Sequence, residues 1–246
     1  MRERMSGHQT TAPVVFLDFD GTITRRDVVD VILETYADER WIEIEKQWRA
    51  GRIGSRDCLR AQMALVRATR EELDALVDSI EVDLGLAPLL ETCARRRLAV
   101  NVVSDGFDYC IRRVLERPRL GLARLLRGVR VCASRLDFDV RGRLRLGFPY
   151  FQETCEHGCA TCKPALMGRL NGAGAPSVFV GDGLSDRYAA ACADIVFAKS
   201  SLARYCRGEG IEHVAYENLS QVAARLDAML DSRRVGGSFA AVPMTA

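Results

Sequence analysis

Residues 14–24 read VVFLDFDGTIT, an apolar run that ends in two aspartates and a glycine. Four consecutive apolar residues predict a buried strand of a parallel sheet. Side chains two positions apart on an extended chain point to the same side, so Asp18 and Asp20 are expected to act at one site. Gly21 then lets the backbone turn sharply. Alone, this acidic strand end would also suit a Ca²⁺ site, so the rest of the chain must decide its function.

Further apolar runs of the same kind recur along the chain, next to segments with helical periodicity. The strand candidates are residues 98–103, 177–180, 194–198 and 213–216. The helix candidates are residues 87–97, 107–117 and 184–193. Strands that alternate with helices predict an α/β fold with a doubly wound parallel sheet. Ligands of such sheets bind beyond the carboxyl ends of the strands, where polar turns are expected in this chain.

A long insertion separates the first two strand candidates. A crossover needs only about a dozen residues, and residues 27–82 show several amphipathic helical patterns instead. We therefore expect a helical cap at 25–83 and an α/β core at 13–24 and 84–232. A small β-hairpin around a turn at Arg141 and Gly142 is expected within the core. Both end segments are expected to be disordered, namely residues 1–12 and 233–246.

The composition is that of a globular protein and argues against several classes. Of 246 residues, 48% are hydrophobic and 28% charged, and the formal net charge of +2 disfavours nucleic acid as a partner. No apolar run reaches the ~20 residues of a membrane span, and residues 1–13 do not resemble a secretory signal. We expect a cytoplasmic protein without a membrane partner. Only three of its 35 basic residues are lysines, namely Lys46, Lys163 and Lys199.

Three further polar motifs follow in chain order, each at the end of a predicted element. Ser104, in VVSDG, offers a hydroxyl and neighbouring N–H groups to an anion. Lys163, in CKPA, opens a predicted helix. Asp182 and Asp186, in GDGLSD, follow another predicted strand. Two acids, a hydroxyl, a lysine and two more acids in this order form a specific pattern.

With these four motifs the sequence resembles the haloacid dehalogenase superfamily of phosphotransferases, over roughly residues 14–200. The insertion after the first motif resembles the helical cap of its phosphoserine-phosphatase-like branch. The resemblance implies a Rossmann-like core and Mg²⁺-dependent hydrolysis of a small phosphorylated metabolite through an aspartyl-phosphate. An aspartate that attacks phosphorus divides one difficult step into two, and a divalent cation offsets the repulsion between carboxylate and phosphate.

The resemblance also implies a role for each acid. Asp18 would be the nucleophile, and Asp20 would protonate the leaving group and then activate water. Asp18, Asp182 and the backbone carbonyl of Asp20 would hold Mg²⁺. Asp186 would lie outside this set and orient Asp182 or Lys163.

Around the phosphate, the resemblance implies Ser104 and Lys163 as ligands of its oxygens. Asp105 lies beside Ser104 as part of this phosphate site, where relatives usually have glycine, and it adds a negative charge. Asp27 stands where phosphoserine phosphatases have a glutamate that meets the substrate amine. An acid at this position also favours the N-terminus of a helix, so both roles stay open for Asp27.

A cysteine-rich run, CEHGCATC, directly precedes Lys163. Cys155, His157, Cys159 and Cys162 could bind zinc, form a redox-sensitive dithiol or pack as a loop, and the sequence leaves this open. The run resembles that of the 2-hydroxy-3-keto-5-methylthiopentenyl-1-phosphate phosphatases, and also that of the phosphoethanolamine/phosphocholine phosphatases. An aspartate at position 27 favours these families over phosphoserine phosphatase, which is the alternative enzyme.

A competing interpretation outside the enzymes is a phospho-accepting signalling module, similar to a response-regulator receiver. Such modules also use a strand-end aspartate, Mg²⁺ and a lysine. They are shorter, however, and have no helical insertion after the first strand. The oligomeric state, including a homodimer, stays open.

Overall fold

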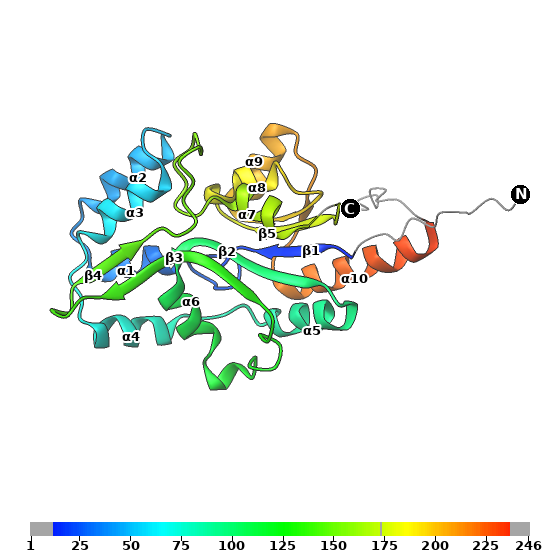
Figure 1. Cartoon of the computed structure of the whole chain (residues 1–246), viewed down its shortest axis with the longest axis horizontal. Helices are drawn as coiled ribbons and strands as arrows, with labels where there is room; N and C mark the ends of the chain where they lie inside the picture. The colour runs from blue at the N-terminus through cyan, green and yellow to red at the C-terminus, as the bar shows by residue number, and fades with distance from the viewer. Residues whose placement is uncertain (1–11, 173, 237–246) are drawn as a thin grey trace, which may run out of the picture.

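The computed structural model describes residues 12–172 and 174–236, which form a seven-stranded sheet with helices on both faces (Figure 1). The strand order is β4-β3-β2-β1-β5-β6-β7, and every neighbouring pair is parallel except β3 and β4. The strands are β1 (Val14–Leu17), β2 (Ala99–Phe107), β3 (Arg130–Phe138), β4 (Leu144–Gly147), β5 (Ser177–Gly181), β6 (Ile195–Ala198) and β7 (Val214–Ala215). The predicted doubly wound α/β fold is confirmed.

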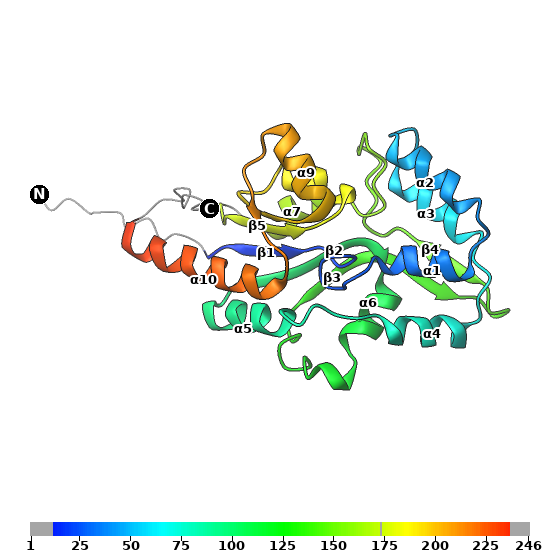
Figure 2. The same ribbon diagram turned by 180° about the vertical axis from the view of Figure 1, so that it is seen from behind.

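Alternate side chains of β1 pack on opposite faces of the sheet, as strand geometry requires. Val15 and Leu17 belong to the apolar cluster on one face, and Val14 and Phe16 to the cluster on the other. The first face is covered by α5 (Leu86–Arg96), α6 (Asp108–Leu115) and α10 (Leu219–Gly236), and the second by α7 (Lys163–Leu170), α8 (Arg187–Ala190) and α9 (Ser200–Glu209) (Figures 1 and 2). The central strands are therefore buried on both sides.

Four helices lie between β1 and α5 in the chain: α1 (Val28–Tyr36), α2 (Trp41–Arg49), α3 (Ser55–Met63) and α4 (Arg70–Ser79). Local sequence explains two of their starts. The Asp27 carboxylate caps α1 by accepting the Asp30 N–H, and Thr69 and Glu72 form a reciprocal capping box at α4. Helices α2 and α3 lie side by side (Figure 2).

Three local expectations differ from the structure. The segment around Ser104 was expected to be a turn, but β2 continues to Phe107 through an irregularity in its pairing with β3. Strand β3 was not expected beyond its hairpin with β4; its first half also pairs in parallel with β2. The helix expected at 184–193 is a short 3₁₀ turn, η2 (Leu184–Asp186), followed by α8.

A second 3₁₀ turn, η1 (Pro118–Leu120), follows α6.

The structure tests the disorder expected at residues 1–12 and 233–246 only in part, because most of these residues lie outside the described ranges. Residues 1–11 and 237–246 lie outside the described residues, whereas α10 continues to Gly236 and so enters the range expected to be disordered. Among the described helices, none combines the length and the apolar character that a membrane span needs.

Candidate active site

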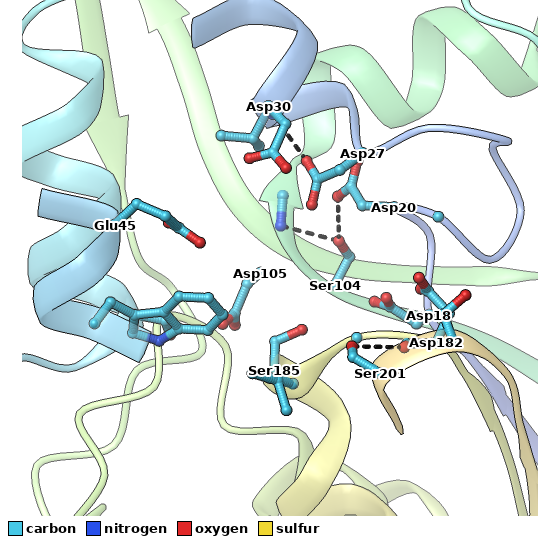
Figure 3. Close-up of a pocket in the computed structure, with 18 of the residues that line it drawn as sticks. Asp18, Asp20, Asp27, Asp30, Glu45, Ser104, Asp105, Asp182, Ser185 and Ser201 are labelled. Atoms are coloured by element: carbon cyan, nitrogen blue, oxygen red, sulfur yellow. Dashed lines mark hydrogen bonds between the residues drawn. The ribbon is translucent and has the colours of Figure 1, made fainter. Parts of the chain in front are cut away.

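A cavity of about 500 Å³ lies between the carboxyl ends of the central strands and helices α2 and α3. Asp18 after β1, Ser104 in β2 and Asp182 after β5 line one side of it, and Glu45 of α2 lies on the other (Figure 3). Parallel strands end at one edge of a sheet, so motifs far apart in the sequence meet there. The structure brings together the acids, the serine and the lysine that the sequence singled out.

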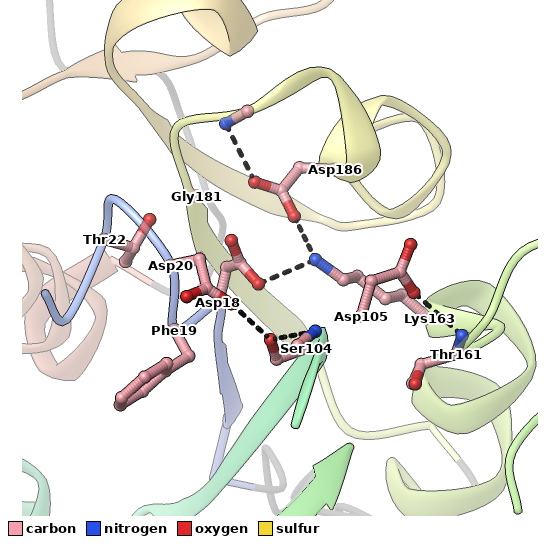
Figure 4. Close-up of polar contacts among 12 residues, drawn as sticks. Asp18, Phe19, Asp20, Thr22, Ser104, Asp105, Thr161, Lys163, Gly181 and Asp186 are labelled. Atoms are coloured by element: carbon pink, nitrogen blue, oxygen red, sulfur yellow. Dashed lines mark hydrogen bonds and ion pairs between the residues drawn. The ribbon is translucent and has the colours of Figure 1, made fainter. Parts of the chain in front are cut away.

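Lys163 lies at the centre of this group, with only 2% of its surface exposed. Its ammonium donates to Asp18 Oδ1 at 2.7 Å and also to Asp186 Oδ1 (Figure 4). Burial lowers the pKa of Lys163, but the charges of Asp18 and Asp186 outweigh burial and raise it. The side chain is therefore a fixed cation at the strand ends.

Asp18, Asp182 and Asp186 form a group that suits a hard cation. Each offers an oxygen, and these atoms lie within 4.8 Å of one another. Burial raises the pKa of Asp18 well above its usual range, and the charge of Asp186 adds to this against the effect of Lys163. Burial and then Asp186 raise the pKa of Asp182 to about 7. The single positive charge of Lys163 does not balance the negative charge of three clustered carboxylates, whereas an added divalent cation bound by their oxygens would.

Within this group Asp186 is held by protein contacts. Its Oδ2 accepts the N–H groups of Asp182 at 3.0 Å and Gly183 at 3.1 Å, while its Oδ1 accepts Lys163. Asp182 is less engaged, with the Thr22 hydroxyl donating to its Oδ1 at 3.1 Å. The carboxylate of Asp186 thus accepts more hydrogen bonds from the protein than those of Asp18 and Asp182 do.

Asp20 lies next to Ser104. The Ser104 hydroxyl donates to Asp20 Oδ2 at 3.2 Å, and the Val28 N–H donates to Oδ1 at 2.9 Å. Burial raises the pKa of Asp20 to about 6, although both of these hydrogen bonds lower it. A carboxyl group with this pKa exchanges protons near neutral pH, as an acid–base group must. A Cβ on Gly106 would lie 2.2 Å from Asp20 Oδ2, so the close approach needs glycine.

The end of the cavity near helices α1–α3 is acidic. Asp27, Asp30 and Glu45 line it together with Trp48 and Gln62. Figure 3 shows Asp27 beside Asp20, with Asp30 and Glu45 on the cap side. Asp27 caps α1 and also lines the cavity, and its contact with a substrate stays a prediction.

Asp105 also lines the cavity, but its carboxylate binds protein groups. Oδ1 accepts the Thr161 N–H at 2.8 Å, and the neighbouring Ala160 N–H donates to the Ser55 hydroxyl at 2.9 Å. Burial raises the pKa of Asp105 even though the charge of Lys163 and the Thr161 N–H lower it. These contacts join β2 to helix α3 and to the loop before Lys163, a connection between α3 and the core that the sequence did not indicate.

Sequence reasoning missed several residues of the cavity. Glu45, Trp48 and Ser55 are polar or amphipathic positions of helices with no motif around them. Thr22 does not line the cavity but contacts Asp182, and it could have been found because it belongs to the first motif. Lys199, to which the sequence assigned no role, also lines the cavity. Burial and then Asp186 raise the pKa of Asp182, and the charge of Lys199 opposes this rise.

Residues 15–191 match the haloacid dehalogenase-like hydrolase family, and the chain belongs to that family. It is 26% identical over 219 residues to the 2-hydroxy-3-keto-5-methylthiopentenyl-1-phosphate phosphatase of Geobacillus kaustophilus, covering 88% of this chain and 96% of that protein. It is 28% identical over 218 residues to the bifunctional enzyme MtnB/MtnX of Bacillus licheniformis, and this match covers 87% of the chain but only 49% of that longer protein.

Solved structures with the same fold include a substrate-bound phosphoserine phosphatase, with a TM-score of 0.66 at 20% identity over 87% of this chain and 98% of that one. The prediction of a phosphatase-class enzyme of the haloacid dehalogenase family is confirmed by the family match and by these relatives. Membership of a hydrolase family argues against the signalling-module interpretation.

Proposed function

We propose that the chain is a Mg²⁺-dependent phosphatase that hydrolyses a small phosphorylated metabolite through an aspartyl-phosphate on Asp18. The contact of the buried Lys163 ammonium with Asp18 Oδ1, at 2.7 Å, carries this proposal. A cation fixed beside the attacking carboxylate lets a phosphate anion approach it and stabilises the charge of the transition state. Ser104, which lies below Asp18 in Figure 4, would supply a hydroxyl to the same phosphate.

In this mechanism Asp18 attacks phosphorus while Asp20 protonates the departing oxygen. Asp20 then accepts a proton from the water that hydrolyses the aspartyl-phosphate. Asp18, Asp182 and the carbonyl of Asp20 would hold the cation, and Asp186 would keep Asp182 and Lys163 in place. When bound, Mg²⁺ supplies Lewis-acid polarisation and offsets the repulsion between carboxylate and phosphate.

Helices α1–α4, within residues 25–83, would act as the cap, and residues 13–24 and 84–232 as the catalytic core. The cavity between them supports this division, since cap residues line it opposite the nucleophile. A cap over the strand ends would exclude bulk water from the aspartyl-phosphate. Nine free cysteines support a reducing compartment, the cytoplasm. The homodimer stays a prediction.

For the substrate, we place 2-hydroxy-3-keto-5-methylthiopentenyl-1-phosphate first. Several relatives carry the name of its phosphatase, and Val29, Trp48 and Leu59 give the cavity an apolar part for a thioether tail. A phosphorylated amine, such as phosphoethanolamine, phosphocholine or phosphoserine, is the second candidate. Asp27 and Asp30 favour it, because carboxylates near the leaving group attract a cation.

A substrate panel with purified protein and Mg²⁺ tests both proposals. Turnover of the methylthiopentenyl ester at least about tenfold above the amine esters, a difference of ~1.4 kcal/mol in the transition state, supports our order. The opposite ratio reverses it. Asp18→Asn is the matched control, since it keeps the cavity but removes the nucleophile. No turnover of any phosphate ester by the wild type would refute the function itself.

A further inference from the structure

The first turn of helix α3 lies against the loop of residues 148–162, which leads from β4 into α7 (Figures 1 and 2). The Arg56 N–H donates to the Gly158 carbonyl at 3.1 Å, and the Ala160 N–H donates to the Ser55 hydroxyl at 2.9 Å. The second of these hydrogen bonds joins residues 105 positions apart in the chain. A helix from the insertion after β1 is thus bound directly to the loop before Lys163.

This contact is close enough to exclude a side chain. A Cβ on Gly54, the N-cap residue of α3, would lie 2.4 Å from the Gly158 carbonyl oxygen and 2.7 Å from the Gly158 Cα. The φ of Gly54 is −78°, which any residue adopts, so the short distance and not the backbone conformation favours glycine. Beside this approach, the guanidinium carbon of Arg56 lies 3.8 Å from the centre of the Phe151 ring. Helix α3 and the loop therefore pack backbone against backbone.

The loop is anchored by three consecutive N–H groups just before Lys163. The N–H groups of residues 160–162 each donate to a different acceptor, namely the Ser55 hydroxyl, Asp105 Oδ1 at 2.8 Å and the Tyr150 carbonyl at 3.1 Å. Figure 4 shows the second of these hydrogen bonds beside Lys163. Of the three acceptors, Ser55 alone belongs to helices α1–α4.

Lys163 depends on these anchors because it is the first residue of α7. The N-cap residue, Cys162, makes no side-chain capping hydrogen bond, so the N–H groups of the loop fix where the helix begins. Ala160 is completely buried, and without the Ser55 hydroxyl its N–H would be left unpaired. The loop would then have to move to pair it. The Lys163 ammonium, now 2.7 Å from Asp18 Oδ1, would move with the loop.

We infer that Ser55 is a positioning residue, which makes the place of Lys163 depend on helix α3 being docked on the loop before α7. With α3 docked, the Ser55 hydroxyl accepts the Ala160 N–H, and the loop holds the Lys163 ammonium beside Asp18. When α3 moves away, this anchor is lost and the phosphate no longer meets a fixed cation. The inference rests on the proposed function, because Lys163 affects turnover only if it binds the phosphate there.

Ser55 also lines the cavity, so direct contact with the substrate is the competing role. The two roles differ in the kinetic constant that they affect and in the range of substrates. A displaced Lys163 acts on the phosphate group that all substrates share, so kcat should fall by the same factor for esters with different leaving groups. A contact between Ser55 and the leaving group would instead change KM, by amounts that differ between esters.

Ser55→Thr and Ser55→Val test the inference as a matched pair, because the two new side chains have nearly the same shape and only threonine keeps a hydroxyl. For an aryl and an alkyl phosphate, the kcat of Ser55→Val should be about tenfold below that of Ser55→Thr, with KM values within about twofold, since ~1 Å of misplacement at a catalytic group can cost about 100-fold. Amide hydrogen exchange, followed by NMR, should be at least about tenfold faster at Ala160 in Ser55→Val.

Gly54→Ala tests the same contact without removing the hydroxyl, and it keeps the test decisive if Ser55→Val does not fold. Its Cβ should push Gly158 away and lower kcat for both esters by about tenfold. Gly208→Ala is the control, because this glycine of α9 has open space around it, and its kcat should stay that of the wild type.

Two kinds of failure are distinguishable. An active wild type with equal kcat or equal Ala160 exchange in Ser55→Thr and Ser55→Val would overturn the inference and leave the proposed function intact. KM changes that differ between the two esters, or an unchanged kcat in Gly54→Ala, would overturn it as well. No turnover by the wild type would refute the proposed function, and the inference with it.

Discussion

Replacing Lys163 by methionine tests the centre of the site most directly. Methionine keeps the length of the side chain and removes its charge, which leaves Asp18 and Asp186 without their buried cation. Breaking a buried ion pair from one side costs about 3–5 kcal/mol. For a domain of this size, ~2–4 °C per kcal/mol translates this loss into a fall in Tm of roughly 6–20 °C.

The destabilisation should depend on pH with a definite sign. The pKa of Asp18 in the folded protein is raised, first by burial and then by Asp186, and removing Lys163 raises it further. A carboxyl of this kind costs no stability below its unfolded pKa and destabilises increasingly as the pH rises towards its folded pKa. The deficit of Lys163→Met should therefore shrink from pH 7 towards pH 4.

The assay is thermal unfolding by circular dichroism, with a chelator present so that no metal compensates for the lost charge. Lys46→Met is the matched control, because Lys46 is exposed and, among the described residues, forms one ion pair, with Glu43 at 3.4 Å. Its effect should stay within about 0.5 kcal/mol. If Lys163→Met keeps the Tm of Lys46→Met at pH 7, the ion-pair reasoning is refuted.

Three further predictions concern the reaction. Asp18→Asn should lower aryl phosphate turnover by at least about 10⁴-fold with little change in Tm, and full activity would contradict the nucleophile. The kcat for alkyl phosphates should fall as the pH rises above about 6, because burial raises the pKa of Asp20 to about 6 and the leaving alkoxide needs its proton. A flat profile from pH 5 to 8 would exclude this role. Gly21→Ala should weaken Mg²⁺ activation, because the added Cβ would lie 2.4 Å from Asp182 Oδ2. Gly51→Ala is the control, since Gly51 also has a positive φ but open space around it, and it should lose only ~1 kcal/mol of stability. A calorimetric Mg²⁺ titration compares the two variants.

Local signals account for what the sequence predicted well. Strand β1 and the acids after it are readable because four apolar residues, two aspartates and Gly21 are adjacent in the chain. Strand β3 was missed as a member of the parallel sheet because Arg130, Arg135 and Asp137 interrupt its apolar pattern. Its pairing with β2 depends on distant residues, and no local propensity encodes that.

The cap side of the cavity could not be predicted for a related reason. Glu45 and Ser55 look like ordinary exposed positions of amphipathic helices, because the helical period tells only which face is apolar. Only the tertiary placement of α2 and α3 turns their polar faces towards the strand ends. The core motifs, in contrast, must lie at strand ends in any parallel sheet, so chain order alone predicts their convergence.

The three lysines of this arginine-rich chain can now be separated by what surrounds them. Lys163 meets two carboxylates with one compact ammonium at 2% exposure, a geometry that a planar guanidinium with five donors cannot adopt in the same space. Lys199 lines the cavity, and its Nζ lies 5.2 Å from the centre of the Tyr216 ring. Burial is the main cause of the raised pKa of Asp182, and the charge of Lys199 opposes this rise. Lys46 is exposed and makes only a surface pair, so arginine would serve there equally well. The need for lysine thus increases with burial and with proximity to the acids, which supports a site built around the charge of phosphate.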